Sequence, residues 1–128
     1  MQYTKEELQG MLESKQMSSD ALQSLIKARE AGEVKFTLVD IREVFEFESS
    51  SINGTDLLLP TSMIQSHLDK LEALKDETVI LYCRTGNRTG QVMSALERMG
   101  HDKVVHLSRG IIAYGGDTTH KAEIPNAL

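Results

Sequence analysis

The residues with the clearest chemical potential are the single cysteine of this 128-residue chain and the residues that follow it. Cys83 begins the segment 83–89, whose sequence is CRTGNRT. Gly86 permits a positive φ, so successive backbone N–H groups can turn toward one point and bind an anion. Arg84 and Arg88 add two cationic charges, and a helix expected to begin within a residue of Arg88 directs its positive end to the same place. Each feature stabilises a thiolate, so we expect a lowered pKa for the Cys83 thiol and a nucleophilic sulfur.

Lone cysteines are more often unreactive and packed in the core as small apolar side chains. That alternative applies to Cys83, but its place between a strand pattern and a helix pattern, beside two arginines, favours a reactive thiol. One cysteine forms no intramolecular disulfide and no cysteine-based metal site. The histidines are too irregularly spaced to form a ligand set: His67, His101, His106 and His120. We therefore expect no metal, and we expect His106 to be a partly buried, hydrogen-bonded side chain rather than a general base.

The hydrophobic pattern alternates between short apolar runs and amphipathic stretches. The apolar runs predict buried strands at residues 36–41, 57–59, 78–82 and 103–107. The amphipathic stretches predict helices that begin at a capping box of Thr4 and Glu7, at Ser18 or Ser19, at Thr61 or Ser62, and at Thr89. This alternation predicts an α/β fold with a mainly parallel sheet. Sites in such folds lie beyond the carboxyl ends of strands, and Cys83 directly follows the predicted strand 78–82.

A length of 128 residues and a mass of 14.3 kDa predict one domain. Within it we expect a helical N-terminal extension packed on the domain at residues 1–32, the main domain at residues 33–115, and a polar, loose C-terminal tail at residues 116–128. A short helix is expected just after the first predicted strand. Its acidic side chains are expected to face solvent: Glu43, Glu46 and Glu48.

The net charge of −5, from 14 basic and 19 acidic side chains, argues against a nucleic-acid partner, because nucleic-acid-binding domains are normally basic. The apolar runs are too short to cross a bilayer, and residues 1–12 lack the pattern of a targeting signal. We therefore expect a cytoplasmic protein with no membrane partner, or a periplasmic one if a signal peptide has been removed. Basic side chains nevertheless outnumber acidic ones by five to two in residues 83–110, so the field near Cys83 favours anionic substrates.

Several short motifs resemble those of single-domain rhodaneses, and together they extend over residues 36–114. They are LVDIRE at residues 38–43 followed by EF at 46–47, ING at 52–54, LYCRTGNRT at 81–89 and GIIAY at 110–114. The resemblance implies a rhodanese-like three-layer domain in which helices flank a mainly parallel central sheet.

The resemblance also implies a sulfurtransferase that needs no cofactor. Cys83 would take the outer sulfur of a small anionic donor, such as thiosulfate or polysulfide, and carry it as a persulfide. An external thiol or a protein cysteine would then accept that sulfur, because the chain has no second cysteine. The persulfide and the donor would be held by the loop residues Arg84, Thr85, Gly86, Asn87, Arg88 and Thr89. Asp40 and Arg42 would support that loop through hydrogen bonds and charge, the alternative being an ion pair that serves the fold alone.

Two other functions are compatible with the same resemblance. The first is a non-catalytic module that uses the rhodanese fold to bind a partner. The second is a cysteine-dependent phosphatase or arsenate reductase, some of which share the fold. Those enzymes have five residues between the cysteine and the arginine of their loop, whereas four separate Cys83 from Arg88. The shorter loop is better sized for a sulfur atom carried on cysteine than for a tetrahedral oxyanion. The sequence does not indicate an oligomeric state.

Overall fold

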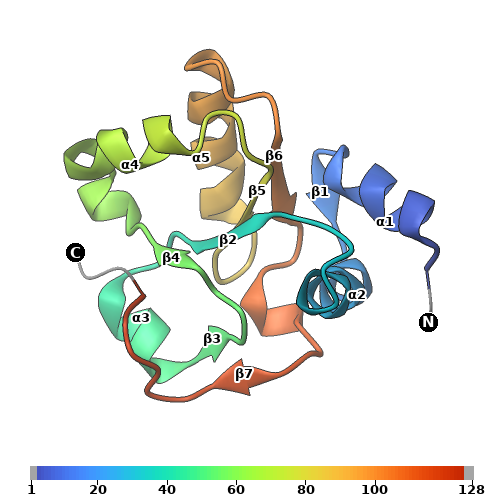
Figure 1. The fold of residues 1–128 in the computed structure, drawn as a ribbon. Helices are drawn as coiled ribbons and strands as arrows, with labels where there is room; N and C mark the ends of the chain where they lie inside the picture. The colour runs from blue at the N-terminus through green and yellow to red at the C-terminus, as the bar shows by residue number, and fades with distance from the viewer. Residues whose placement is uncertain (1–2, 126–128) are drawn as a thin grey trace.

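Residues 3–125 are described by the structure, a computed structural model of the chain. Within them, five short strands form a sheet in the order β1–β6–β5–β2–β4, and every neighbouring pair is parallel. The strands are β1 (Gln16–Met17), β2 (Thr37–Asp40), β4 (Leu57–Leu58), β5 (Val79–Tyr82) and β6 (Val104–Leu107). The predicted α/β fold with a mainly parallel sheet is confirmed (Figure 1).

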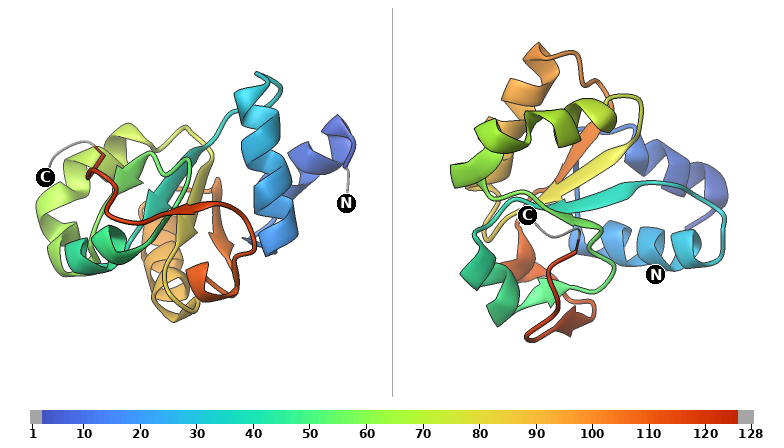
Figure 2. Two further views of the ribbon diagram at one scale, coloured as in Figure 1. Left: turned by 90° about the horizontal axis from the view of Figure 1, so that it is seen from below. Right: turned by 60° about the vertical axis from the view of Figure 1, so that its left-hand side comes forward.

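Helices cover both faces of this sheet, because side chains along each strand point alternately to one face and the other. Ile80 and Tyr82 of β5 join the core formed with α1 (Lys5–Leu12) and α2 (Ser19–Glu30). Leu81 and Cys83 join the opposite core, formed with α4 (Leu68–Ala73) and α5 (Asn87–Arg98). Figure 2 shows the two helical layers with the sheet between them. The alternation along β5 therefore places the cysteine on the α5 side of the sheet.

The predicted starts of the first two helices are confirmed. Thr4 and Glu7 form the capping box of α1, and the Ser18 hydroxyl accepts a hydrogen bond from the backbone N–H of Ala21 at the start of α2. The long helix predicted from Thr61 is wrong. That segment is a 3₁₀ helix, η1 (Thr61–His67), followed by the short α4, because the backbone at His67 (φ −121°, ψ 25°) leaves the helical region between them.

The N-terminal and C-terminal parts of the described residues pair with strands of the domain, which the hydrophobic pattern does not indicate. β1 forms one edge of the sheet, with Gln16 opposite His106. Near the other end, β7 (Thr118–Thr119) pairs antiparallel with β3 (Ser51–Ile52). The tail predicted to be loose is therefore held through β7, while residues 126–128 of that tail lie outside the described residues. The domain limits at residues 32 and 115 stay predictions.

Three short elements follow the carboxyl ends of strands of the sheet. They are α3 (Val44–Ser49), η1, and a second 3₁₀ helix, η2 (Ile111–Ala113). α3 directly follows β2, and η2 follows β6 (Figure 1). No described helix is long and apolar enough to span a membrane.

Candidate active site

Cys83 lies at the point where β5 ends and α5 is about to begin. Its side chain is buried, with 1% of the residue exposed. Gly86 is the N-cap of α5 and has a φ of 102°, so the predicted positive φ is confirmed. This left-handed residue turns the chain from the strand into the helix within four residues of the cysteine, which aims the first N–H groups of α5 back toward the sulfur.

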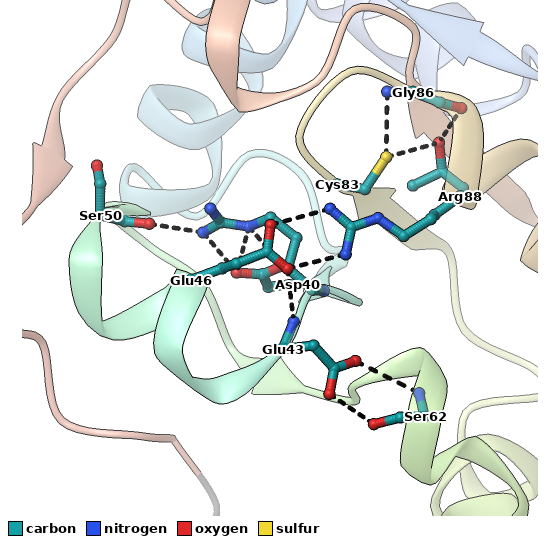
Figure 3. A network of polar contacts seen from close by, with 10 residues as sticks. Asp40, Glu43, Glu46, Ser50, Ser62, Cys83, Gly86 and Arg88 are labelled. Carbon is teal, nitrogen blue, oxygen red and sulfur yellow. Dashed lines mark hydrogen bonds and ion pairs between the residues drawn. The ribbon is translucent and has the colours of Figure 1, made fainter.

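The sulfur lies beside a backbone N–H donor and a hydroxyl group. The backbone N–H of Gly86 donates to the Cys83 Sγ at 3.1 Å, and the Thr89 hydroxyl oxygen lies 3.9 Å from the sulfur. Figure 3 shows the sulfur facing the nitrogen of Gly86. The Thr89 hydroxyl is in turn held by the Gly86 carbonyl at 2.9 Å and by His106 Nδ1 at 2.8 Å. His106 is thus the partly buried, hydrogen-bonded histidine that its strand position predicted.

Two opposing effects act on the pKa of the Cys83 thiol. Burial raises the pKa, but hydrogen bonds from the backbone of Thr89 and Gly86, from the Thr89 hydroxyl and from the backbone of Arg88 outweigh it. The pKa therefore lies below its ordinary value, as predicted. The sequence argument named the guanidinium charges beside the backbone N–H groups and the helix end, and the lowering comes mainly from hydrogen bonds.

The backbone of residues 111–112 holds the cysteine loop in place through hydrogen bonds. The N–H of Ile111 donates to the carbonyl of Cys83 at 2.9 Å, and the N–H of Ile112 donates to the carbonyl of Arg84 at 3.1 Å. Gly110, with a φ of 68°, makes this approach possible, since a Cβ there would collide with the Arg84 carbonyl. Gly86 is equally constrained, because its Cβ would collide with the carbonyl of Ser108.

Arg88 is held by a carboxylate from α3. Its two terminal nitrogens donate to the two oxygens of Glu46 at 2.8 and 3.0 Å, a bidentate pair visible in Figure 3. These hydrogen bonds lower the pKa of Glu46 to about 2. The prediction that the acidic side chains of α3 face solvent is wrong for Glu46. The Glu43 carboxylate also accepts hydrogen bonds, from the backbone N–H and the hydroxyl of Ser62. Sequence reasoning missed the Glu46–Arg88 pair because the two residues are 42 positions apart.

Asp40 and Arg42 form a buried ion pair at the end of β2. The Arg42 guanidinium donates to both carboxylate oxygens at 2.8–3.1 Å, and its Nη2 also donates to the Ser50 carbonyl just after α3 at 2.6 Å. Burial raises the pKa of Asp40, and the hydrogen bonds and charge of Arg42 oppose that rise. The hydrogen bond to Ser50 ties the end of β2 to the end of α3, the helix that carries Glu46, and support of the cysteine loop by this pair stays a prediction.

A cavity of about 460 Å³ adjoins the cysteine loop. It is bounded by Arg84, by side chains of α3 and by Ile111 and Ile112. Arg84 is exposed and has no ion-pair partner among residues 3–125. Thr85 and Asn87 are exposed as well, but they do not line the cavity. Arg84 is the loop residue that lines it. No group of three metal-ligating side chains is found in the described part of the chain.

Comparisons with known proteins find similarity over most of the chain. The family model described as Rhodanese-like domain matches residues 21–117. A protein named Sulfurtransferase from Allochromatium vinosum is 36% identical over 77 residues, which cover 60% of this chain and 69% of that protein. The Probable adenylyltransferase/sulfurtransferase MoeZ of Mycobacterium tuberculosis is 35% identical over 80 residues, 62% of this chain but 20% of that protein. The chain therefore matches about a fifth of the length of the mycobacterial relative.

Solved structures show the same fold. The structure of a Rhodanese-like Domain Protein from Staphylococcus aureus superposes with a TM-score of 0.68 at 25% identity, covering 85% of this chain and all of that one. The three-layer architecture with a parallel central sheet, expected from the motifs, is confirmed by this match and by the strand order.

The lowered pKa of Cys83 predicts the pH dependence of alkylation by iodoacetamide. Because Cys83 is the only cysteine, the reaction reports on this thiol alone. We expect the rate to rise with a midpoint below about 8.5, the value of a free cysteine, and to show that ordinary value in the urea-unfolded chain. Since the folded pKa is the lower one, stability gained from the thiolate is present above the unfolded pKa and lost as the pH falls through the folded pKa. Equal midpoints in the folded and unfolded chains would contradict the assignment.

Substitution of Gly110 should disturb the loop. Gly110→Ala combines a positive φ with a collision against the Arg84 carbonyl, so we expect a loss of about 2 kcal/mol in the free energy of unfolding, together with slower alkylation of Cys83. Gly90→Ala is the matched control, because nothing lies within 4 Å of the added Cβ in α5; it should be neutral or stabilising by about 0.5–1 kcal/mol. Urea unfolding measures both. The explanation fails if the two variants behave alike.

Breaking the buried ion pair should be costly. Asp40→Asn leaves the Arg42 guanidinium buried without its countercharge, and we expect the free energy of unfolding to fall by about 3–5 kcal/mol. Glu72→Gln is the control, since Glu72 faces Lys75 at 3.9 Å on an exposed surface and should change stability by less than about 0.5 kcal/mol. A loss of similar size in both variants, measured by urea unfolding, would show that the buried pair is not special.

Proposed function

This chain belongs to the family of rhodanese-like domains, and we propose that it is a sulfurtransferase in which Cys83 carries sulfane sulfur as a persulfide. The observation that carries the proposal is the sulfur itself, which is buried at the end of β5 and accepts a hydrogen bond from the N–H of Gly86, the N-cap of α5. Such a site stabilises a negative charge on sulfur, both in the resting thiolate and in a persulfide. Relatives named as sulfurtransferases support the same reaction class.

The first half of the reaction loads the cysteine. The Cys83 thiolate attacks the outer sulfur of the donor, a new S–S bond forms, and the bond between that sulfur and the rest of the donor breaks. With thiosulfate the leaving group is sulfite, which departs with the electron pair, so the charge of −3 is the same before and after. The product is a Cys83 persulfide whose terminal sulfur bears the negative charge. Because Arg88 is bound by Glu46, contact with an anionic donor falls to Arg84.

The second half of the reaction removes the sulfur from Cys83. The thiolate of an external acceptor attacks the terminal sulfur of the persulfide, which regenerates the Cys83 thiolate and leaves a persulfide on the acceptor. Cyanide reacts in the same way and gives thiocyanate. No second cysteine exists in the chain to take the sulfur internally, so an external thiol or a protein cysteine is required. Two such displacement steps imply ping-pong kinetics.

The rival functions make different use of the loop. A phosphatase must wrap several N–H groups around a tetrahedral oxyanion, whereas here the Gly86 N–H is directed at the sulfur and four residues separate Cys83 from Arg88. A partner-binding module needs no thiol of lowered pKa. The geometry therefore favours sulfur transfer over both. A cytoplasmic location, with a periplasmic one as its alternative, and the lack of nucleic-acid and membrane partners stay predictions.

Sulfur loading tests the proposal. Incubation with thiosulfate or polysulfide should add the mass of one sulfur atom to Cys83, and cyanide should then release it as thiocyanate. Cys83→Ser should reduce thiocyanate formation to the level without protein, since a hydroxyl forms no persulfide. Ser94→Ala, a change on the exposed surface of α5, should leave the rate unchanged and serves as the matched control. Full turnover by Cys83→Ser, or hydrolysis of phosphate esters without any sulfur loading, would overturn the proposal.

A further inference from the structure

Three polar atoms lie around the hydroxyl of Thr89, a fully buried residue in the first turn of α5. The hydroxyl oxygen lies 2.9 Å from the carbonyl oxygen of Gly86 and 2.8 Å from Nδ1 of His106. It also lies 3.9 Å from the sulfur of Cys83. A hydroxyl has one proton to donate and can accept two hydrogen bonds. The direction of this one proton therefore decides which of the three neighbours receives a donor.

A count of donors and acceptors shows which nitrogen of His106 carries a proton. A carbonyl oxygen only accepts, so the Thr89 hydroxyl is the donor in its contact with Gly86. The hydroxyl then has no proton left for the histidine, and the 2.8 Å contact is a hydrogen bond only if Nδ1–H donates to the Thr89 oxygen. With an unprotonated Nδ1, one of the two contacts would be two acceptors facing each other in a buried position, which is unfavourable.

The sheet fixes the place of His106 in this network. In register, His106 lies opposite Gln16 of β1 on one side and Leu81 of β5 on the other. Residues opposite each other in a parallel sheet project to the same face, and Leu81 belongs to the core that contains Cys83. The ring of His106 therefore lies on the α5 side of the sheet, where Thr89 is.

The charged side chains beside this ring are paired. Lys15, which directly precedes β1, is bound to Glu97 of α5 at 2.6 Å. Arg88 in the first turn of α5 is bound to Glu46. Burial lowers the pKa of His106, so the ring is neutral at about pH 7 and above. A neutral ring with its proton on Nδ1 meets the donor count, and the titratable group that shares the threonine hydroxyl with it is the cysteine.

We propose that His106 is a positioning residue for the thiolate of Cys83. Its Nδ1–H binds the Thr89 oxygen and leaves the hydroxyl proton free to turn from the Gly86 carbonyl to the sulfur when the thiol ionises. The carbonyl then keeps a second donor, the N–H of Gly90 at 3.3 Å. His106 takes no proton from the sulfur and is not a general base. This inference deepens the proposed sulfurtransferase function, on which its part in catalysis rests.

The protonated nitrogen of His106 can be observed directly. Long-range ¹H–¹⁵N NMR of the imidazole rings distinguishes the two neutral tautomers, and comparison with His106→Asn identifies the signals of this ring. At about pH 7.5, above the pKa of an ordinary histidine, we expect the Nδ1–H tautomer in the unmodified chain. An Nε2–H tautomer would overturn the proposal, because the Thr89 proton would then be bound to the ring and withheld from the sulfur.

Substitution separates the donor from the ring. His106→Leu removes Nδ1–H, and a hydroxyl that accepts no hydrogen bond is a weaker donor, so the midpoint of iodoacetamide alkylation of Cys83 should rise by about half a pH unit. His106→Asn places an amide N–H near the position of Nδ1 and should restore the original midpoint. Gln16→Leu is the matched control, because Gln16 is exposed and lies opposite His106 in β1; the midpoint should not move. A lower midpoint in His106→Leu would overturn the proposal.

A double-mutant cycle tests whether His106 acts through Thr89. Thr89→Val keeps the shape of the side chain without its hydroxyl, so the midpoint should rise by about one pH unit. Adding His106→Leu should then change it no further. A further rise in the double variant would show that the histidine acts on the sulfur by another route, and would overturn the proposal.

The outcomes separate this inference from the proposed function. The tautomer and the alkylation midpoint report on the thiol and need no sulfur transfer. If Cys83 fails to load sulfur from thiosulfate while the midpoints shift as expected, the sulfurtransferase function is overturned and the positioning role stands. Normal loading, with the same midpoint in His106→Leu as in the unmodified chain, would overturn the positioning role alone. The tautomer is measured in the unmodified chain, so the test holds even if a variant fails to fold.

Discussion

Backbone N–H groups that donate to the sulfur of Cys83 are the interaction on which the rest of the site depends. Burying an anion without such donors is prohibitively unfavourable. The turn at Gly86 supplies them, and the contact between that loop and the segment 108–112 prevents the turn from opening. Two glycines, Gly86 and Gly110, lie at this contact. A side chain at either position would collide with a backbone carbonyl of the other segment. The reactive sulfur thus depends on close backbone packing as much as on charge.

Arginine and carboxylate pairs form a second level of support. Arg42 links the end of β2 to the end of α3, and α3 carries Glu46, which holds Arg88 at the start of α5. Three segments that are distant in sequence are thereby fixed around one edge of the sheet (Figure 3). The same pairs neutralise Arg42 and Arg88, so the network that positions the site also limits the charge that it offers to a donor.

The sequence predicts those features that depend on neighbouring residues. The apolar runs identify β2, β4, β5 and β6, and the step from an apolar run to CRTGNRT locates the cysteine loop and the positive φ of Gly86. The sequence does not predict features that depend on partners distant along the chain. β1, β3 and β7 have two residues each and, unlike β4, lie outside any apolar run, so no pattern marks them. Glu46 belongs to an acidic stretch that resembles a solvated helix face until Arg88 is brought beside it. By contrast, the backbone hydrogen bonds that lower the pKa of Cys83 come from the same local segment, whose glycine indicated that N–H groups turn toward one point.

The most direct test is NMR titration of the backbone amide protons of the cysteine loop. If the N–H groups of Gly86, Arg88 and Thr89 hold the charged sulfur, their proton signals should move downfield as the thiol ionises, with one shared midpoint below about 8.5. The shifts should be absent in Cys83→Ser. Amide signals that do not respond to the ionisation of Cys83, or a shared midpoint at or above the value of a free cysteine, would contradict the claim that backbone donors create the reactive sulfur.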